Sequence, residues 1–193
     1  MADRSSRRPR RKGAAASDGQ RRQLARASRL AAAPLAPATA RASARVLCDG
    51  GSRGNPGPAA IAAVLFAPDG SLLDRRSSPI GRATAAEAEY RAILLGLELA
   101  ATHGADPLEL CSDSLLAIEA VQRAGAADVG LDAVAGAADA GLNARAGAAD
   151  AGLEGLVRQI RAASRRFSAV SWRWHPAREN EPADALVREL LWH

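Results

Sequence analysis

The sequence predicts an α/β fold in which helices pack on a mixed β-sheet. Two apolar runs and a third strand-like run with one polar face come first, separated by turn residues, and after residue 84 apolar residues at helical spacing alternate with two further strand-like runs. At 193 residues the chain is long enough for one domain with extensions. We therefore expect three strands, a helix, a strand, one or two helices, a strand and a final helix, in that order.

The elements follow from local patterns. Residues 50–58 form a glycine- and proline-rich turn, and Pro68-Asp69-Gly70 indicates a hairpin. Residues 84–103 carry apolar side chains every three or four positions and are followed by Gly104, which predicts a helix and its end. Strands are predicted at 46–48, 59–67, 71–78, 107–112 and 167–174, and the other helices at 114–123, 153–165 and 181–191.

An internal repeat occupies residues 124–153. The pattern Ala-Gly-Ala-Ala-Asp-x-Gly-Leu occurs three times at 11-residue intervals, beginning at Ala124, Ala135 and Ala146. The period suits at most a weak helical repeat, and three glycine-rich copies are too few for a solenoid. We interpret this triple repeat as a surface insertion, partly helical at best, with no chemistry of its own.

The N-terminal residues 1–44 differ in composition from the rest. Residues 1–45 hold 12 of the 26 basic residues and only two acids, whereas the remainder carries 14 basic and 19 acidic residues, a formal charge of −5. Such a basic, aromatic-free segment is typical of a disordered tail that attracts phosphates. A solubilising extension and an organellar transit peptide are the alternatives.

Several classes of protein are disfavoured by composition. Cys48 and Cys111 fall inside apolar runs, where a reduced thiol behaves as a small hydrophobe, and no Cys/His cluster suggests zinc or an iron–sulfur cluster. No apolar run approaches the roughly 18 residues of a membrane span, and the N-terminus lacks the apolar core of a signal peptide. We expect a cytoplasmic monomer with no membrane partner.

Four carboxylates are hard to explain structurally. They are Asp49, Glu89, Asp113 and Asp184. Two end apolar strand-like runs and two lie near helix starts, so a fold that gathers strand ends and helix starts would bring four negative charges together. Their repulsion would raise the pKa values unless divalent cations bound there, and an all-oxygen site suits Mg²⁺ or Mn²⁺. Glu87, by contrast, is explained by an exposed pair with Arg91.

Four motifs, in this order, resemble type 1 ribonuclease H in its short or reverse-transcriptase-like form. They are DGGSRGNPGPAA at 49–60, AEYRAILLGL at 88–97, SDS at 112–114, and REN with ADAL at 178–186. The resemblance covers residues 45–193 apart from the triple repeat. It implies the ribonuclease H-like fold, a five-stranded mixed sheet in which parallel strands follow three antiparallel ones.

The resemblance also implies a function, namely a metal-dependent endonuclease that hydrolyses the RNA strand of RNA–DNA hybrids. In that family the acids matching Asp49, Glu89, Asp113 and Asp184 bind two Mg²⁺ ions, which activate a water and stabilise the leaving oxygen; Mn²⁺ is a possible substitute. Carried over to this chain, Asp49 would bridge the two ions. Asp184 would hold the ion that activates water, and Glu89 and Asp113 would hold the other ion.

Candidate substrate-binding residues are Gly50, Ser52, Asn55, Thr84 and Asn180. The glycines of the 50–58 turn would let the backbone approach the hybrid, and the Asn55 amide could hydrogen-bond a ribose 2′-OH. His175 lies on the loop before the last acid, where it is either a catalytic proton shuttle or an ordinary loop histidine.

Departures from the family leave alternatives open. Ala85 and Ala86 stand where relatives carry two asparagines, and a basic protrusion is missing, so hybrid affinity should be lower. A nucleic-acid-binding module with little turnover is therefore the alternative function. A 3′–5′ exonuclease is a third, although it needs a Tyr or His beside the last acid, where Ala183 and Ala185 stand. Trp172 and Trp174 are expected to pack the core or line its edge.

Removing residues 1–44 should weaken hybrid binding without changing which strand is cut, because the tail supplies phosphate attraction and the acids supply the chemistry. The slope of log affinity against log salt should become shallower by about 0.7 to 0.9 for each phosphate that the tail had neutralised. Titration of a labelled hybrid in metal-free buffer at several salt concentrations measures it. Identical slopes for full-length and truncated protein would make the tail a spectator.

Overall fold

The sheet has five strands, as predicted. The computed structural model describes residues 43–131 and 148–192 of the chain. The strands are β1 (Ala44–Ser52), β2 (Gly57–Phe66), β3 (Leu72–Ala83), β4 (Leu108–Ser112) and β5 (Val170–Trp174), in the spatial order β3-β2-β1-β4-β5. The first three pair antiparallel, whereas β4 runs parallel to β1 and β5 parallel to β4. The predicted mixed architecture is therefore confirmed.

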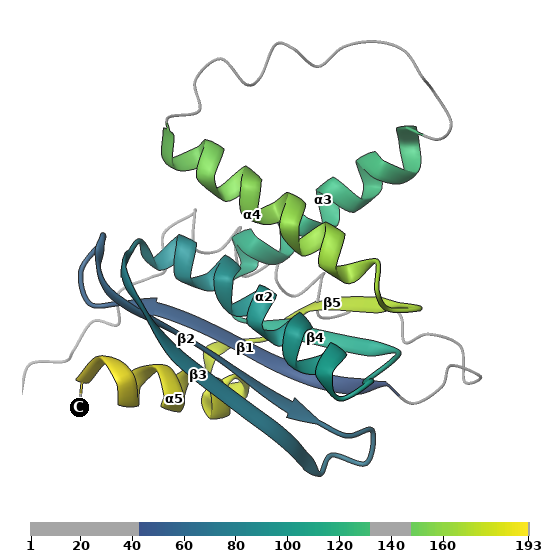
Figure 1. Cartoon of the computed structure of the whole chain (residues 1–193), viewed down its shortest axis with the longest axis horizontal. Coiled ribbons are helices and arrows are strands. Elements are labelled where there is room, and N and C mark those ends of the chain that lie inside the picture. Colours follow the sequence, from purple (N-terminus) through teal and green to yellow (C-terminus); the bar gives the residue numbers. More distant parts are fainter. Residues whose placement is uncertain (1–42, 132–147, 193) are drawn as a thin grey trace, which may run out of the picture.

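Helices cover both faces of the sheet (Figure 1). They are α2 (Ala85–Thr102), α3 (Leu115–Leu131), α4 (Ala148–Ser164) and α5 (Glu181–Trp192), with a short 3-10 turn η1 (Ala177–Glu179) before α5. Helices α2, α3 and α4 bury the main core on one face, and α5 packs on the other through Val187 and Leu191. None of the helices in the described residues is long and apolar enough to span a bilayer.

The glycines of the predicted 50–58 turn have a different role. Strand β1 continues to Ser52, so Gly50 and Gly51 are strand residues and the turn is shorter than expected. A Cβ on Gly50 would overlap the backbone of Ala88 in α2, and one on Gly51 would lie 3.1 Å from Val187 Cγ1 in α5. These glycines thus let helices on both faces approach β1, and their predicted contact with a ligand stays a prediction.

The triple repeat is more helical than predicted. Its first copy lies within α3, which ends at Leu131 rather than near residue 123, and its third copy overlaps the start of α4. The middle copy lies outside the described residues. Alanine has the highest helix propensity, and Leu153 packs against the main core, so helical packing outweighs the glycines. Gly125 also gives space to Arg161 of α4, whose Cζ would lie 2.9 Å from an added Cβ.

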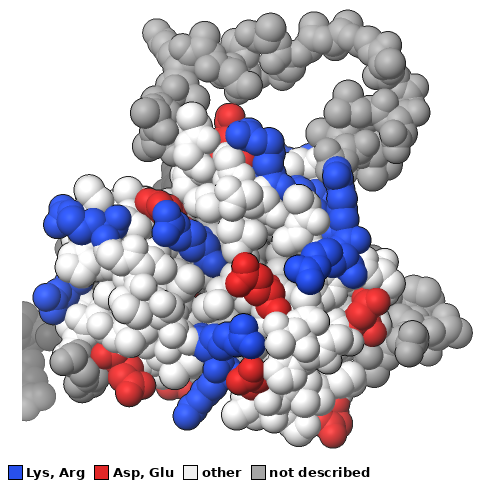
Figure 2. Space-filling view, viewed as in Figure 1, with Lys and Arg blue, Asp and Glu red and all other residues white. Residues whose placement is uncertain are grey.

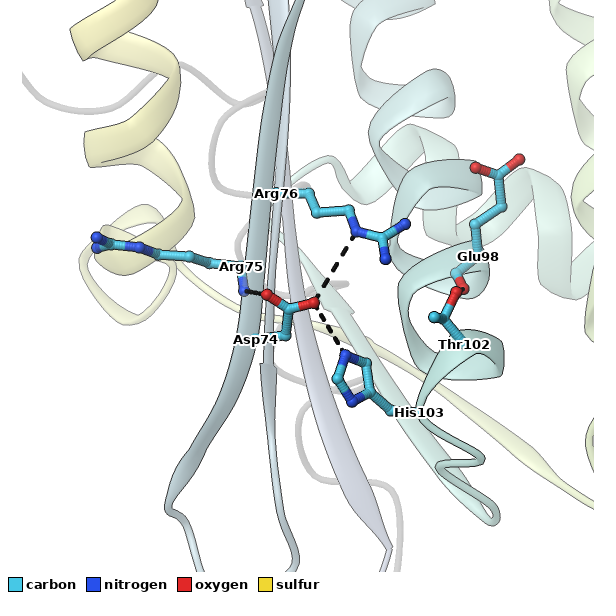
Figure 3. A network of polar contacts seen from close by, with 6 residues as sticks. All are labelled: Asp74, Arg75, Arg76, Glu98, Thr102 and His103. Atoms are coloured by element: carbon cyan, nitrogen blue, oxygen red, sulfur yellow. Dashed lines mark hydrogen bonds and ion pairs between the residues drawn. The ribbon is translucent and has the colours of Figure 1, made fainter.

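A polar network joins the edge strand β3 to the end of α2 (Figure 3). Asp74 Oδ2 lies 2.9 Å from His103 Nε2 and 3.9 Å from Arg76 Nε, and its Oδ1 accepts a hydrogen bond from the Arg75 N–H. The hydrogen bond with His103 is the main reason that the pKa of Asp74 is lowered. His103 therefore has a structural role, joining the end of α2 to β3.

Close packing of α2 on β1 gives a stability prediction. A Cβ on Gly96 would overlap the sulfur of Cys48, which is buried and free as expected. Gly96→Ala should lower the free energy of unfolding by about 1 to 3 kcal/mol through overpacking. The control Gly152→Ala, where nothing lies within 4 Å, should instead stabilise by up to about 1 kcal/mol. Urea unfolding measures both.

Adding Cys48→Ala to Gly96→Ala should recover part of the loss, since it removes the atom that the new methyl group meets. A Gly96→Ala variant as stable as the wild type would contradict the close approach of α2 to β1.

Candidate metal centre

Three of the four predicted acids converge. Carboxylate oxygens of Asp49, Glu89 and Asp113 lie within 4.8 Å of one another. Asp49 is in β1, and Asp113 follows β4, whose Ser112 pairs with Cys48 of the parallel neighbour β1. Glu89 lies on the second turn of α2, whose start is fixed by Thr84, because its Oγ1 accepts a hydrogen bond from the Glu87 N–H at 3.1 Å. The parallel β1/β4 pair and the capped helix together place the three carboxylates.

Burial and mutual repulsion dominate the electrostatics of this centre. Burial, followed by the charges of Asp113 and Asp184, raises the pKa of Asp49 to about 7. Burial, followed by Asp49 and Asp113, raises the pKa of Glu89 to about 9, although a hydrogen bond from the Gly50 N–H opposes this. The pKa of Asp113 is raised for the same first reason. At neutral pH the group therefore retains protons unless a cation compensates the charges.

The donor set fits a divalent cation. Glu89 Oε2 and Asp113 Oδ1 are buried and have no hydrogen-bond partner among the described residues. Buried carboxylate oxygens without partners are costly, and an all-oxygen site is the kind that Mg²⁺ and Mn²⁺ prefer. Asp49, Glu89 and Asp113 are thus the residues that could hold a metal ion.

Asp184 stands apart from this group. It lies in the first turn of α5, and its Oδ2 is 3.1 Å from Arg188 Nη2 one turn later. Its negative charge nevertheless helps to raise the pKa values of Asp49 and Asp113, so it borders the same centre. The structure therefore brings three acids together and places the fourth beside them, paired with an arginine.

Comparison with known proteins identifies the family. A family model described as reverse transcriptase-like matches residues 47–131. Ribonuclease HI of Halobacterium salinarum is 52% identical over 68 residues, which is 35% of this chain and 34% of that protein. The crystal structure of ribonuclease H1 from the same archaeon is 34% identical, with a TM-score of 0.62 over 76% of this chain and 95% of the solved one. The chain belongs to the type 1 ribonuclease H family.

A third relative within the ribonuclease H family is LC11-RNase H1, isolated from compost and solved in complex with an RNA/DNA hybrid. It is 25% identical, with a TM-score of 0.57 over 76% of this chain and 94% of that one. The matched region spans only about a third of the length of the curated relatives, 34% in each case.

Asn180 holds one of the site acids, Asp49, through a hydrogen bond. Its side chain is fully buried, and its Nδ2 donates to Cys48 O at 2.9 Å and to Asp49 Oδ1 at 3.3 Å. Asn180 is a predicted substrate-binding residue, but a fully buried amide does not reach a bound nucleic acid. Asn180 instead orients Asp49, and its hydrogen bond also opposes the rise in the pKa of Asp113. Its position four residues before Asp184 is the only sequence signal for this role.

Trp174 is a supporting residue that the sequence analysis missed. Its Nε1 donates to the backbone carbonyl of Asp113 at 3.0 Å, which holds the loop carrying that acid. Trp172, two residues earlier in β5, packs against the main core as expected. Alternation of two tryptophans predicted packing but gave no sign of the hydrogen bond to a site residue.

The other predicted substrate-binding side chains hold the β1–β2 turn and the start of α2. Ser52 Oγ donates to Gly54 O at 2.6 Å, and Asn55 Oδ1 accepts from the Ala85 N–H at 3.2 Å. Arg53 Nη1 donates to Leu191 O at 3.2 Å, which ties the same turn to the end of α5. The turn is therefore fixed relative to both helices that carry site acids, α2 and α5.

His175 belongs to a different group of side chains. Its ring lies within 4.8 Å of donor atoms of Glu109 and Cys111, next to a cavity of about 430 Å³ that it lines together with Arg45. Glu109 Oε1 is 2.7 Å from Arg45 Nε, and its Oε2 is 3.6 Å from Arg173 Nε. Two guanidinium groups repel a cation, so we assign the metal centre to the three acids. A catalytic role for His175 gains no support from this position.

The raised pKa values predict how stability depends on pH. In the absence of divalent cations, the free energy of unfolding should fall by a few kcal/mol, as an order of magnitude, when the pH rises from about 5 to about 9. In the folded chain the pKa values of Asp49 and Glu89 are about 7 and about 9, whereas in the unfolded chain they return to their ordinary values of about 4. Between these values the unfolded chain loses protons that the folded chain keeps, so rising pH favours unfolding. Urea unfolding in EDTA at three pH values measures the slope.

Asp113→Asn should flatten this slope and raise the stability at neutral pH by about 1 kcal/mol, because it removes one of the repelling charges. Glu98→Gln, on an exposed position of α2, is the matched control and should leave the slope unchanged. An unaltered slope in Asp113→Asn would mean that the acids do not interact.

Proposed function

We propose that this chain is an endonuclease that uses divalent cations, Mg²⁺ in preference and Mn²⁺ as a substitute, to hydrolyse the RNA strand of RNA–DNA hybrids. The observation that carries the proposal is the group of Asp49, Glu89 and Asp113, with raised pKa values and orphaned buried oxygens. A module that only binds nucleic acid has no use for a buried acidic group that destabilises its own fold. The family and the hybrid bound to LC11-RNase H1 point to the same substrate.

In the proposed reaction, one set of residues would bind the metal ions and another would hold those residues in position. Asp49, Glu89 and Asp113, with Asp184 beside them, would hold two divalent ions. Such a pair supplies a water of lowered pKa and stabilises the charge on the attacking and leaving oxygens. Asn180 donates to the carboxylate of Asp49, Trp174 holds the backbone at Asp113, and the Gly50 N–H donates to Glu89.

Positive charge for a polyanionic substrate comes from arginines. In the described residues, Arg158 and Arg161 lie on α4, and Arg165 and Arg166 follow it. Figure 2 shows basic side chains gathered near the crossing of α3 and α4, whereas acidic and basic groups are mixed elsewhere on that face. Phosphate contacts of this kind position a nucleic acid without reading its sequence. Asn55, on the exposed turn beside α2, stays our candidate for contacting a ribose 2′-OH.

One feature favours the second candidate, a binding module with little turnover. Ala85 and Ala86 begin α2 with exposed methyl groups, where the family resemblance leads us to expect hybrid-contacting asparagines. The proposed enzyme should consequently bind the hybrid more weakly than relatives that carry them. The exonuclease alternative gains no support. It needs a Tyr or His beside the last acid, and the alanine before that acid, Ala183, is fully buried and has no group that could act in catalysis.

Cleavage of an internally and end-labelled hybrid in Mg²⁺ or Mn²⁺ tests the proposal. The wild type should cut the RNA strand at internal positions and leave duplex RNA and duplex DNA intact. Asp113→Asn should lose activity by more than about 100-fold while still binding the hybrid, because it keeps the fold but removes a metal ligand.

His175→Ala is the matched control, and it should retain most of the activity. Hybrid binding by the wild type without any cleavage would establish the binding module instead. Products released one nucleotide at a time from an end would establish an exonuclease.

A further inference from the structure

Among the four site acids, Asp184 is the one that already has a cationic partner. Arg188 Nη2 lies 3.1 Å from Asp184 Oδ2 and 3.9 Å from Glu181 Oε1, so one guanidinium serves two acids at the start of α5. The other three acids face one another, and two of them carry buried oxygens with no partner among the described residues. Within the part of the chain that the structure describes, the centre is therefore divided into an acidic group without an ion-pair partner and an acid that has one.

The charge of Arg188 also reaches the acidic group. It opposes the rise in the pKa of Asp49, in contrast to the charges of Asp113 and Asp184, which promote it. The guanidinium contacts Asp184 directly, so a second divalent ion bound by Asp184 would come close to its positive charge. A cation entering there would meet a positive charge and would have to replace it as the partner of Asp184.

We propose that Arg188 is a positioning residue that holds Asp184 as a counter-ion, so that the metal centre fills in two unequal steps. The first cation binds to Asp49, Glu89 and Asp113, and the second binds only as Arg188 releases Asp184. This inference rests on the proposed function, since it assumes that the acids bind divalent cations.

The Arg188–Asp184 ion pair is exposed to solvent, which allows Arg188 to be displaced from Asp184. The side chains of Arg188 and Asp184 are 56% and 36% exposed, and an ion pair in contact with water is weak enough to open readily. A released guanidinium keeps all of its donors, which match the oxygens of a phosphate group. Entry of the second cation is thereby linked to the arrival of a phosphodiester, which would stabilise the open position of Arg188.

The simpler explanation is that the pair only stabilises α5, as charge pairs one turn apart do. A matched pair tests this. Arg91 Nη2 lies 2.6 Å from Glu87 Oε1 at the same spacing on α2, with side chains 42% and 32% exposed. If helix stabilisation were the whole effect, loss of either arginine would have the same consequence for metal binding.

Mn²⁺ titration of the full chain by calorimetry, with free Mn²⁺ followed by electron paramagnetic resonance, separates the two explanations. The wild type should bind in one tight and one weak step. Arg188→Gln should tighten the weak step about three- to tenfold and change the tight step less than twofold, because it removes the competing charge. Arg188→Lys keeps that charge and should resemble the wild type, and Arg91→Gln should change neither step.

Asp49→Asn shows whether the tight step belongs to the acidic group, because it should abolish that step. If Asp49→Asn does so while Arg188→Gln leaves the weak step unchanged or weakens it, the role of Arg188 is overturned and the proposed function stands. If the wild type binds no Mn²⁺ at all, both proposals fail. Thermal unfolding of every variant distinguishes a defect in binding from a defect in folding.

Discussion

The structure depends on one costly arrangement, the burial of three carboxylates within 4.8 Å of one another. Burial is the largest cause of the raised pKa of each acid, ahead of the repulsion between them. A folded chain tolerates such a cost only where the backbone leaves the side chains no alternative. Here the parallel β1/β4 pair and the packing of α2 through Gly50 and Gly96 fix the three acids from separate directions. The arrangement that lowers the stability of the folded chain also places three carboxylate oxygens where they could bind one cation.

Around this group, the structure keeps apart the polar contacts that support the acids and those that a ligand would use. Asn180, Trp174 and the Gly50 N–H hold the acids through atoms that are buried or belong to the backbone. Arg188 and the exposed arginines near α4 lie where solvent or a polyanion can reach them. Buried support for the acids and exposed positive charges around them suit chemistry on a large polyanionic substrate.

The sequence predicted the fold and the acids that converge, but it did not predict the residues that hydrogen-bond to those acids. Asp49, Glu89 and Asp113 could be found because a carboxylate next to an apolar run has few structural explanations. Asn180 and Trp174 could not be assigned, because their partners lie 132 and 61 residues away along the chain. The role of Gly50 in admitting α2 could not be foreseen, because a glycine that admits a neighbouring helix has the same local pattern as one in a turn. The helical content of the repeat was underestimated because its glycines were given more weight than the helix propensity of its alanines, and because the packing of Leu153 on the core is not visible in a local pattern.

The repeat has a consequence for how this protein can vary between generations. Each copy is 11 residues, about three α-helical turns, so within a helix equivalent residues of successive copies would differ in direction by only about 20°. Tandem copies are also prone to slippage during DNA replication. The first and third copies lie in α3 and α4, whereas the acids lie on β1, α2, the end of β4 and α5. A gain or loss of one copy would therefore fall outside the elements that carry the acids, and its effect on activity would come through the packing of α3 and α4 and the arginines near their crossing.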